Sequence, residues 1–324
     1  MRRGVHFTHD FPPRARAPPA AGERDLAAHL AHDVKPSELT SLLLDVARCR
    51  ANRRTPADVL AEYERDRFSR PARLSPVHLA RFELLAFAHL PAVFEPITLA
   101  LVTPLGTAAV VANVSQDWAV ATTRGFEVVS DATNVLALEA AVRRRALGPR
   151  SRGEVHLAAH HRLLRPQFFH GPRQTAHFAL LALVSTARAG RGSSVELALV
   201  ALHVRAHLAV IRAATAVDVP LRVVLSDFSE RNREEAVRAE VIAPLSDAFE
   251  GVTFEVNAER QRGRGYYTGL AFEVYGRAND EDVFLVDGGE VQWVARLPSN
   301  AKERTVISGL GSERLCSVFG TDER

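Results

Sequence analysis

Apolar residues recur at helical spacing in four stretches of the chain, and this spacing predicts helices there. The four stretches are 75–90, 133–146, 193–213 and 229–249. Ser75 suits the N-cap of the first helix, and Pro76 suits its first helical position. Ser193 and Glu196 have the spacing of a capping box at the start of the third helix. We also expect a short helix over 312–319.

Short apolar runs bounded by turn residues lie between these helices and predict strands. The expected strands cover 94–106, 108–116, 124–133, 221–228, 252–257, 268–276, 282–289 and 304–311. Two longer runs, 154–167 and 174–188, are separated by the short loop 168–173 and predict a β-hairpin. Because strands that look antiparallel alternate with helices, we expect an α+β domain.

The N-terminal part of the chain differs from the rest. Residues 1–22 are rich in arginine and proline, and we expect a flexible arm there. Residues 23–70 predict a helical appendage, with Ser37 and Thr55 as N-caps of two of its helices. Residues 71–324 form the expected core domain.

The composition is that of a soluble globular protein, with 47% hydrophobic and 24% charged residues. A net charge of only +3 predicts no strong attraction to polyanions. Two cysteines, Cys49 and Cys316, cannot form a four-ligand zinc site, and so few cysteines indicate a reducing compartment. The chain has no uncharged apolar stretch of about 18 residues and no secretory signal. We therefore expect a cytoplasmic protein with no membrane contact and no metal site of its own.

The sequence RGRGYYTGLAFE, residues 262–273, combines arginines, glycines that allow close backbone approach, and two adjacent tyrosines. It resembles the motif Arg-Gly-Leu-Asp-Tyr-Tyr-Thr-Gly-x-x-Phe-Glu of histidyl-tRNA synthetase. The regulatory subunit of ATP phosphoribosyltransferase, a non-catalytic relative of that enzyme, has a similar motif.

Other stretches resemble signatures of the same family, in the order that the family has them. Residues 124–140 resemble its strand–turn–helix, and 160–177 resemble motif 2, the hairpin that clamps ATP in class II synthetases. Residues 307–315 resemble motif 3, and 75–101 resemble the motif 1 region of the dimer interface. The resemblance implies a class II synthetase-like fold, with a mainly antiparallel sheet flanked by helices, in a homodimer.

The resemblance also implies roles for the matched residues. Arg162 and Arg314 would bind the phosphates of ATP, and Gly311 would let the adenine approach. Arg262 would bridge the substrate carboxylate and the α-phosphate, so Arg162 and Arg262 would be the catalytic residues. Mg²⁺ would accompany ATP if the site is active. The substrate pocket would contain Asp131, Thr133, His177, Tyr266 and Tyr267.

This assignment is chemically consistent. Formation of an aminoacyl-adenylate needs positioning and charge neutralisation rather than a protein nucleophile. Arginine forks suit the phosphates, and a carboxylate such as Asp131 suits the ammonium group of an amino acid.

The chain departs from the family pattern at several positions. Leu164 replaces the motif 2 glutamate, and Gly265 stands where the synthetase has aspartate. His177 takes the place of a glutamine that contacts the substrate, and the turn Gly-Gly-Arg-Tyr-Asp becomes 288–292, Gly-Gly-Glu-Val-Gln. We expect no anticodon-binding domain, and therefore no ordinary tRNA charging.

Simpler interpretations of the same residues stay open. Asp131 could cap the helix that follows it. Arg162 and Arg314 could pair with carboxylates, and one of the two tyrosines could belong to the core. His203 and His207 fit a helix face better than a metal site.

Three functions are compatible with the sequence. The first is a histidyl-tRNA synthetase-like paralogue that binds ATP and an amino acid, histidine or a similar one, and forms an aminoacyl-adenylate. The second is a non-catalytic regulatory subunit that senses histidine and binds a catalytic ATP phosphoribosyltransferase subunit. The third is a scaffold with an inactive pocket.

Overall fold

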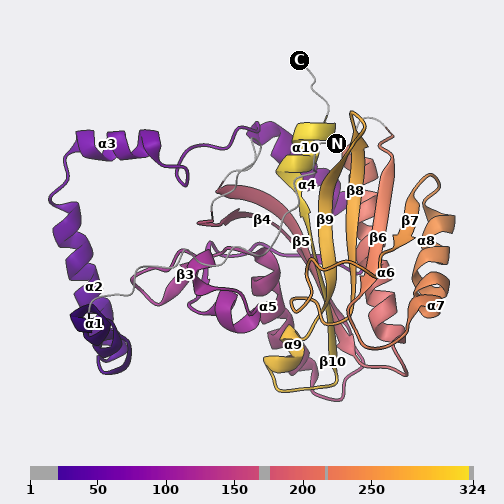
Figure 1. Cartoon of the computed structure of the whole chain (residues 1–324), viewed down its shortest axis with the longest axis horizontal. Helices are drawn as coiled ribbons and strands as arrows, with labels where there is room; N and C mark the ends of the chain where they lie inside the picture. The colour runs from indigo at the N-terminus through magenta and orange to yellow at the C-terminus, as the bar shows by residue number, and fades with distance from the viewer. Residues whose placement is uncertain (1–20, 168–175, 216–217, 321–324) are drawn as a thin grey trace.

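The computed structural model describes residues 21–167, 176–215 and 218–320 (Figure 1). Its main strands are β1 (Glu95–Pro96), β4 (Val155–Leu164), β5 (His177–Arg188), β6 (Leu221–Asp227), β7 (Thr253–Val256), β8 (Leu270–Ala278), β9 (Glu281–Val291) and β10 (Glu303–Gly311). They form one sheet in the order β1-β4-β5-β10-β9-β8-β6-β7. Neighbouring strands are antiparallel except for β1 with β4 and β6 with β7. The expected α+β fold with a mainly antiparallel sheet is confirmed.

Helices cover both faces of this sheet. The core helices are α4 (Pro76–His89), α5 (Ala132–Leu147), α6 (Ser194–Ala214), α7 (Glu234–Ala236), α8 (Ala243–Ala248), α9 (Trp293–Arg296) and α10 (Ser312–Phe319). α4, α6 and α10 pack on one side, which we call the α6 face. α5 and α9 pack on the other side, which we call the α5 face.

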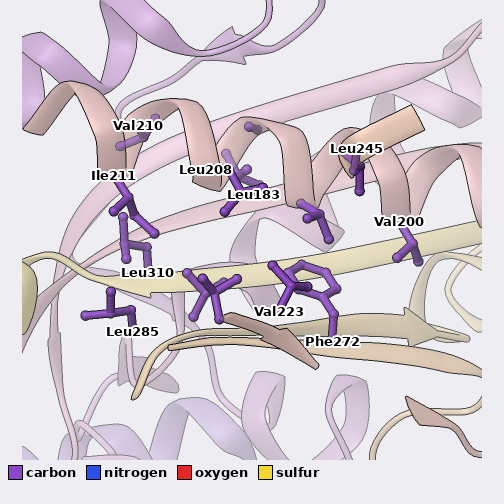
Figure 2. Packing of buried hydrophobic residues seen from close by; sticks show 14 of the residues in the cluster. Leu183, Val200, Leu208, Val210, Ile211, Val223, Leu245, Phe272, Leu285 and Leu310 are labelled. Carbon is purple, nitrogen blue, oxygen red and sulfur yellow. The ribbon is translucent and has the colours of Figure 1, made fainter. Parts of the chain in front are cut away.

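The largest apolar cluster lies between α6 and the sheet. Leu208 and Ile211 of α6 pack toward Leu183, Leu310 and the strands beyond them (Figure 2). By length and composition α6 could cross a membrane, but most of the helix is buried in this cluster. Burial of both α6 and its strands makes α6 the core helix of the domain.

The appendage consists of α1 (Ala21–His32), α2 (Pro36–Ala51) and α3 (Pro56–Arg65), which extend away from the sheet (Figure 1). α2 and α3 bury none of their residues. Thr55 caps α3 in a capping box with Asp58, as predicted. The prediction for Ser37 is wrong, because α2 begins at Pro36. Most of the expected arm lies outside the described residues, and the domain boundaries stay predictions.

The prediction of a strand at 108–116 is wrong. The chain forms a short two-stranded sheet, β2 (Val102–Pro104) with β3 (Phe126–Val128), and turns between them as η1 (Thr107–Val111) and η2 (Gln116–Trp118). The Glu127 carboxylate of β3 accepts hydrogen bonds from the backbone nitrogens of Gly106 (2.9 Å) and Ala108 (2.8 Å). Because a side chain from a distant strand satisfies these donors, the segment turns instead of pairing.

Two other local predictions also change. The helix expected over 229–249 begins at Glu234 and contains a π-helical turn, η3 (Val237–Ile242), between α7 and α8. The capping box at Ser193 does not form. Its partner Glu196 lies instead 2.9 Å from Nε of Arg304 in β10. Ser75 does cap α4, accepting a hydrogen bond from the backbone nitrogen of Val77.

Candidate functional site

The predicted site residues are divided between the two faces of the sheet. Side chains alternate along β4, so Leu163 packs in the cluster of the α5 face together with Tyr267. His160 lies on the α6 face, with its ring centroid 5.3 Å from that of Phe82 in α4. Arg162 follows His160 by two residues on the same strand, so its side chain also faces the α6 side of the sheet. The predicted residues that gather on the α5 face are Asp131, Thr133, Arg262, Tyr266 and Tyr267.

Asp131 is the N-cap of α5. Its Oδ1 accepts hydrogen bonds from the backbone nitrogen (2.9 Å) and the hydroxyl (2.8 Å) of Thr133. Its Oδ2 lies 3.1 Å from Nη2 of Arg165. Arg165 is held by the Ser130 carbonyl at 2.8 Å and lies over the Phe178 ring at 5.2 Å. Asp131 therefore caps the helix and also offers a fixed carboxylate, with 22% of its side chain exposed.

Three aromatic side chains pack against one another, and one of them, Tyr266, lies near Asp131. The Tyr266 ring meets the Tyr267 ring edge-on at 5.0 Å and the Trp293 ring edge-on at 5.6 Å. Burial raises the pKa of both tyrosine hydroxyls well above the usual value. The second largest cause is a nearby negative charge. For Tyr266 it is the charge of Asp131, and for Tyr267 it is the charge of Asp287. The two hydroxyls therefore lie near the two carboxylates.

The glycines before the tyrosines have a geometric reason. Gly263 and Gly265 have φ of 85° and 84°, in the left-handed region. A Cβ at Gly263 would lie 2.8 Å from the Tyr267 ring, whereas one at Gly265 would meet nothing within 4 Å. The turn can close because the Tyr267 nitrogen donates to the Gly263 carbonyl at 2.9 Å. Glycine at 263 thus lets the backbone touch the aromatic cluster.

Two arginines and two carboxylates lie beside the tyrosines. Arg260 Nη2 lies 3.0 Å from Asp287 and 3.6 Å from Glu273. Arg262 lies 3.5 Å from Glu273 and 3.8 Å from Asp287. The Arg260 side chain is only 3% exposed, and its Nη1 has no hydrogen-bond acceptor within the described part of the chain. A buried donor without an acceptor is uncommon in proteins, so this nitrogen is an unsatisfied polar group within the cluster.

Arg314 meets Arg262 at the ring of Phe284. The guanidinium carbons lie 5.8 Å and 4.1 Å from the ring centroid, respectively. Arg314 Nη1 also donates to the Phe284 carbonyl at 2.8 Å. Burial, and then the charge of Arg262, lowers the pKa of Arg314. At Gly311 an added Cβ would lie 3.7 Å from Arg314, an ordinary contact, so nothing in the chain itself requires glycine there.

Arg162 and His177 lie apart from this group. Arg162 Nη2 lies 2.6 Å from Oε1 of Glu313 in α10, and its Nη1 donates to Nδ1 of His177 at 2.9 Å. His177 Nε2 in turn donates to the Arg70 carbonyl at 2.6 Å. Since a strand residue faces one side of the sheet only, Arg162 would need a one-residue shift along β4 to reach the tyrosines.

Sequence reasoning missed four residues of the α5 face: Arg165, Arg260, Glu273 and Asp287. A signal existed for two of them. Arg165 is the arginine of Arg-Pro-Gln in the motif 2 stretch, and Glu273 closes the RGRGYYTGLAFE motif. Among the described residues, no group of three or more His, Cys, Asp or Glu side chains is placed to hold a metal ion.

Comparison with family models and with curated proteins finds no match. Solved structures do match. An ATP phosphoribosyltransferase regulatory subunit/histidyl-tRNA synthetase from Bacillus halodurans is 16% identical, with a TM-score of 0.55 over 78% of this chain and 83% of that one. Histidyl-tRNA synthetase from S. aureus is 16% identical, with a TM-score of 0.55 over 78% and 68%.

A histidine–tRNA ligase subunit from Alicyclobacillus acidocaldarius is 17% identical, with a TM-score of 0.51 over 76% of this chain and 95% of that one. Identities this low establish the fold and not the activity. The strand order, the helices on both faces and these neighbours agree, and the chain has the fold of a class II aminoacyl-tRNA synthetase catalytic core, as in histidyl-tRNA synthetase and its relatives.

Proposed function

We propose that this chain is a paralogue of the synthetase core that binds an amino acid on the α5 face of its sheet. The observation that carries the proposal is the fixed carboxylate of Asp131 beside Tyr266. An ammonium group binds a carboxylate that is held in place, and aromatic walls with hydroxyls suit a polar or ring-containing side chain. Histidine or a similar amino acid is the first candidate ligand.

Arg165 is the residue that an incoming ammonium group would meet. Its guanidinium lies 3.1 Å from the Asp131 oxygen that Thr133 leaves open. Binding would therefore shift Arg165 or add the ammonium beside it. Arg260, with its buried Nη1 donor, is the candidate partner for the ligand's own carboxylate.

Binding without activation fits the arginines better than adenylate formation does. Arg162, the expected partner of the α-phosphate, is paired with Glu313 on the α6 face. This favours the regulatory alternative, in which a homodimer of this chain senses histidine and binds a catalytic ATP phosphoribosyltransferase subunit. The Bacillus halodurans neighbour carries the name of such a regulatory subunit. A cytoplasmic location belongs to the same proposal.

Amino-acid activation with ATP and Mg²⁺ is the second candidate. Arg262 and Arg314 favour activation, because both guanidinium groups lie at the Phe284 ring and together could bind a phosphate. Mg²⁺ would arrive with the nucleotide, which supplies most of its ligands.

Calorimetric titration of the purified protein with each amino acid, with and without ATP-Mg²⁺, tests these proposals. We expect one amino acid to bind without ATP and the Asp131→Asn variant to lose that binding, because asparagine keeps the helix cap but removes the charge. Asp117→Asn, at an exposed position, is the matched control. Binding only in the presence of ATP, with exchange of pyrophosphate into ATP, would favour activation. Binding of no amino acid to the folded protein would leave the scaffold alternative.

A further inference from the structure

The strands β4 and β10 begin, and β5 ends, at the same end of the sheet (Figure 1). Six basic residues lie in the segments that meet at this end. They come from the last turn of α5, the loop before β4, the end of β5 and the loop that follows it, and the turn before β10. We call this group the basic end. It consists of Arg145, Arg150, Arg152, Arg188, Arg191 and Lys302.

Hydrogen bonds hold the contributing loops together. Arg188 Nη1 donates to the Pro149 carbonyl at 2.5 Å, which ties β5 to the loop before β4. The Ala189 nitrogen donates to the Lys302 carbonyl at 2.7 Å, which ties the loop after β5 to the turn before β10. Three segments that are distant in sequence therefore lie side by side at this end of the sheet.

The charge of the basic end is not neutralised locally. Within the described ranges, no ion pair involves any of its six cations. The nearby acids Glu303 and Glu196 are buried and paired with Arg144 and Arg304. Glu154 is the exposed acid at its edge. The six cations of the basic end are therefore a local positive charge on a chain whose net charge is only +3.

The loops have the composition of a phosphate-binding surface. Residues 148–153, 188–193 and 299–303 read GPRSRG, RAGRGS and SNAKE. Small residues let a backbone approach closely, and arginine forks match phosphate geometry. The loops contain no aromatic side chain, so they have nothing on which an unpaired base could stack. The loops also contain no large apolar side chain, and the exposed Leu147 and Leu297 at their flanks are single residues rather than an apolar face that could insert into a membrane.

We propose that the basic end binds the phosphate backbone of double-helical nucleic acid. The contacts are to phosphates and are independent of base sequence. The amino end of α6 begins in the same surface at Ser194 and adds its dipole to the arginines. The surface is separate from the amino-acid site proposed at Asp131. Asp131 and Arg165 lie beyond the other end of β4, and ten strand residues span roughly 30 Å.

Fluorescence anisotropy with a short labelled RNA duplex, and with a DNA duplex of the same sequence, tests this proposal. The test variant is Arg150→Glu/Arg152→Glu/Arg191→Glu. The matched control is Arg124→Glu/Arg231→Glu/Arg277→Glu, which changes the net charge equally at exposed arginines elsewhere. Circular dichroism and the thermal midpoint verify that both variants fold. We expect duplex affinity to fall about a thousandfold between about 50 and 200 mM salt, as for six phosphate contacts.

The expected result is at least a tenfold loss of affinity in the test variant and a salt slope about three units shallower, with the control close to wild type. Equal losses in the two variants would overturn the proposal, because net charge alone would then explain the binding. No duplex binding at low salt would overturn it as well. So would binding of phosphatidylserine vesicles by a protein that ignores both duplexes, since the partner would then be a membrane.

Discussion

Arg162 Nη2 lies 2.6 Å from Oε1 of Glu313, and this ion pair joins β4 to the first turn of α10 on the α6 face. Arg162 is 39% exposed and Glu313 15% exposed, so solvent screens the pair from one side only. The pair gives the motif 2 arginine a structural role that is independent of any nucleotide.

We expect Arg162→Met to lower the free energy of unfolding by about 1 kcal/mol, since it removes a half-exposed pair and leaves the Glu313 carboxylate with fewer donors. Urea unfolding measures this effect. Amino-acid binding on the α5 face should not change, because the side chain faces the other way. A variant of normal stability that has lost ligand binding would place Arg162 in the site after all.

Substitutions of Asp131 should affect the stability of the fold and the binding of the amino acid separately. Asp131→Ala removes the N-cap of α5 and should lower the free energy of unfolding by about 1 kcal/mol. Asp131→Asn keeps a capping side chain and should cost less, yet both variants should lose the amino-acid ligand. Denaturation and calorimetry on the same preparations distinguish the two. If Asp131→Asn binds the ligand normally, Asp131 is a cap only.

Gly263 and Gly265 form a matched pair for testing the turn. Both have positive φ, so alanine at either position should cost about 1 kcal/mol of backbone strain. Gly263→Ala should cost more, because its Cβ would lie 2.8 Å from the Tyr267 ring, while that of Gly265→Ala would meet nothing within 4 Å. Urea unfolding compares the two variants. Equal losses would mean that Tyr267 moves aside freely.

Stability should fall in mild acid because of two buried histidines. His203 and His207 both contact the Ser308 hydroxyl at 2.7 Å, and His203 also contacts Ser185 at 2.8 Å. Burial lowers the pKa of His207 to about 3 and that of His203 well below its usual 6.5. Below about pH 6.5 the unfolded chain binds protons that the folded chain does not, so the loss begins there and grows as the pH falls.

At pH 5 the lowered pKa of His207 should cost about 2 kcal/mol relative to neutral pH, and His203 should add a loss in the same direction. Urea unfolding at several pH values gives the slope. The double variant His203→Gln/His207→Gln should flatten it, whereas His89→Gln, at an exposed position, should not. An unchanged slope in the double variant would mean that other groups control acid stability.

Local signals in the sequence predicted much of the fold. Helical and strand periodicities identified α4, α5, α6 and the β4–β5 hairpin, and cap chemistry placed Thr55 and Ser75 correctly. Motif order pointed to a synthetase-like core, which the structural neighbours confirm as a fold. These signals are local because they depend on bonding between residues a few positions apart.

Tertiary structure decided what depends on distant partners. Glu196 pairs with Arg304 instead of forming the expected capping box. The Glu127 carboxylate binds the backbone at 106 and 108, and the helical turn η1 follows where a strand was expected over 108–116. The sequence by itself pointed to Arg162, Arg262 and the two tyrosines, but not to Arg165 or Arg260, nor to the side of the sheet that each would face. In a strand a shift of one residue reverses that side, and only the pairing of β4 with β5 and the packing of α10 put Arg162 opposite Tyr267.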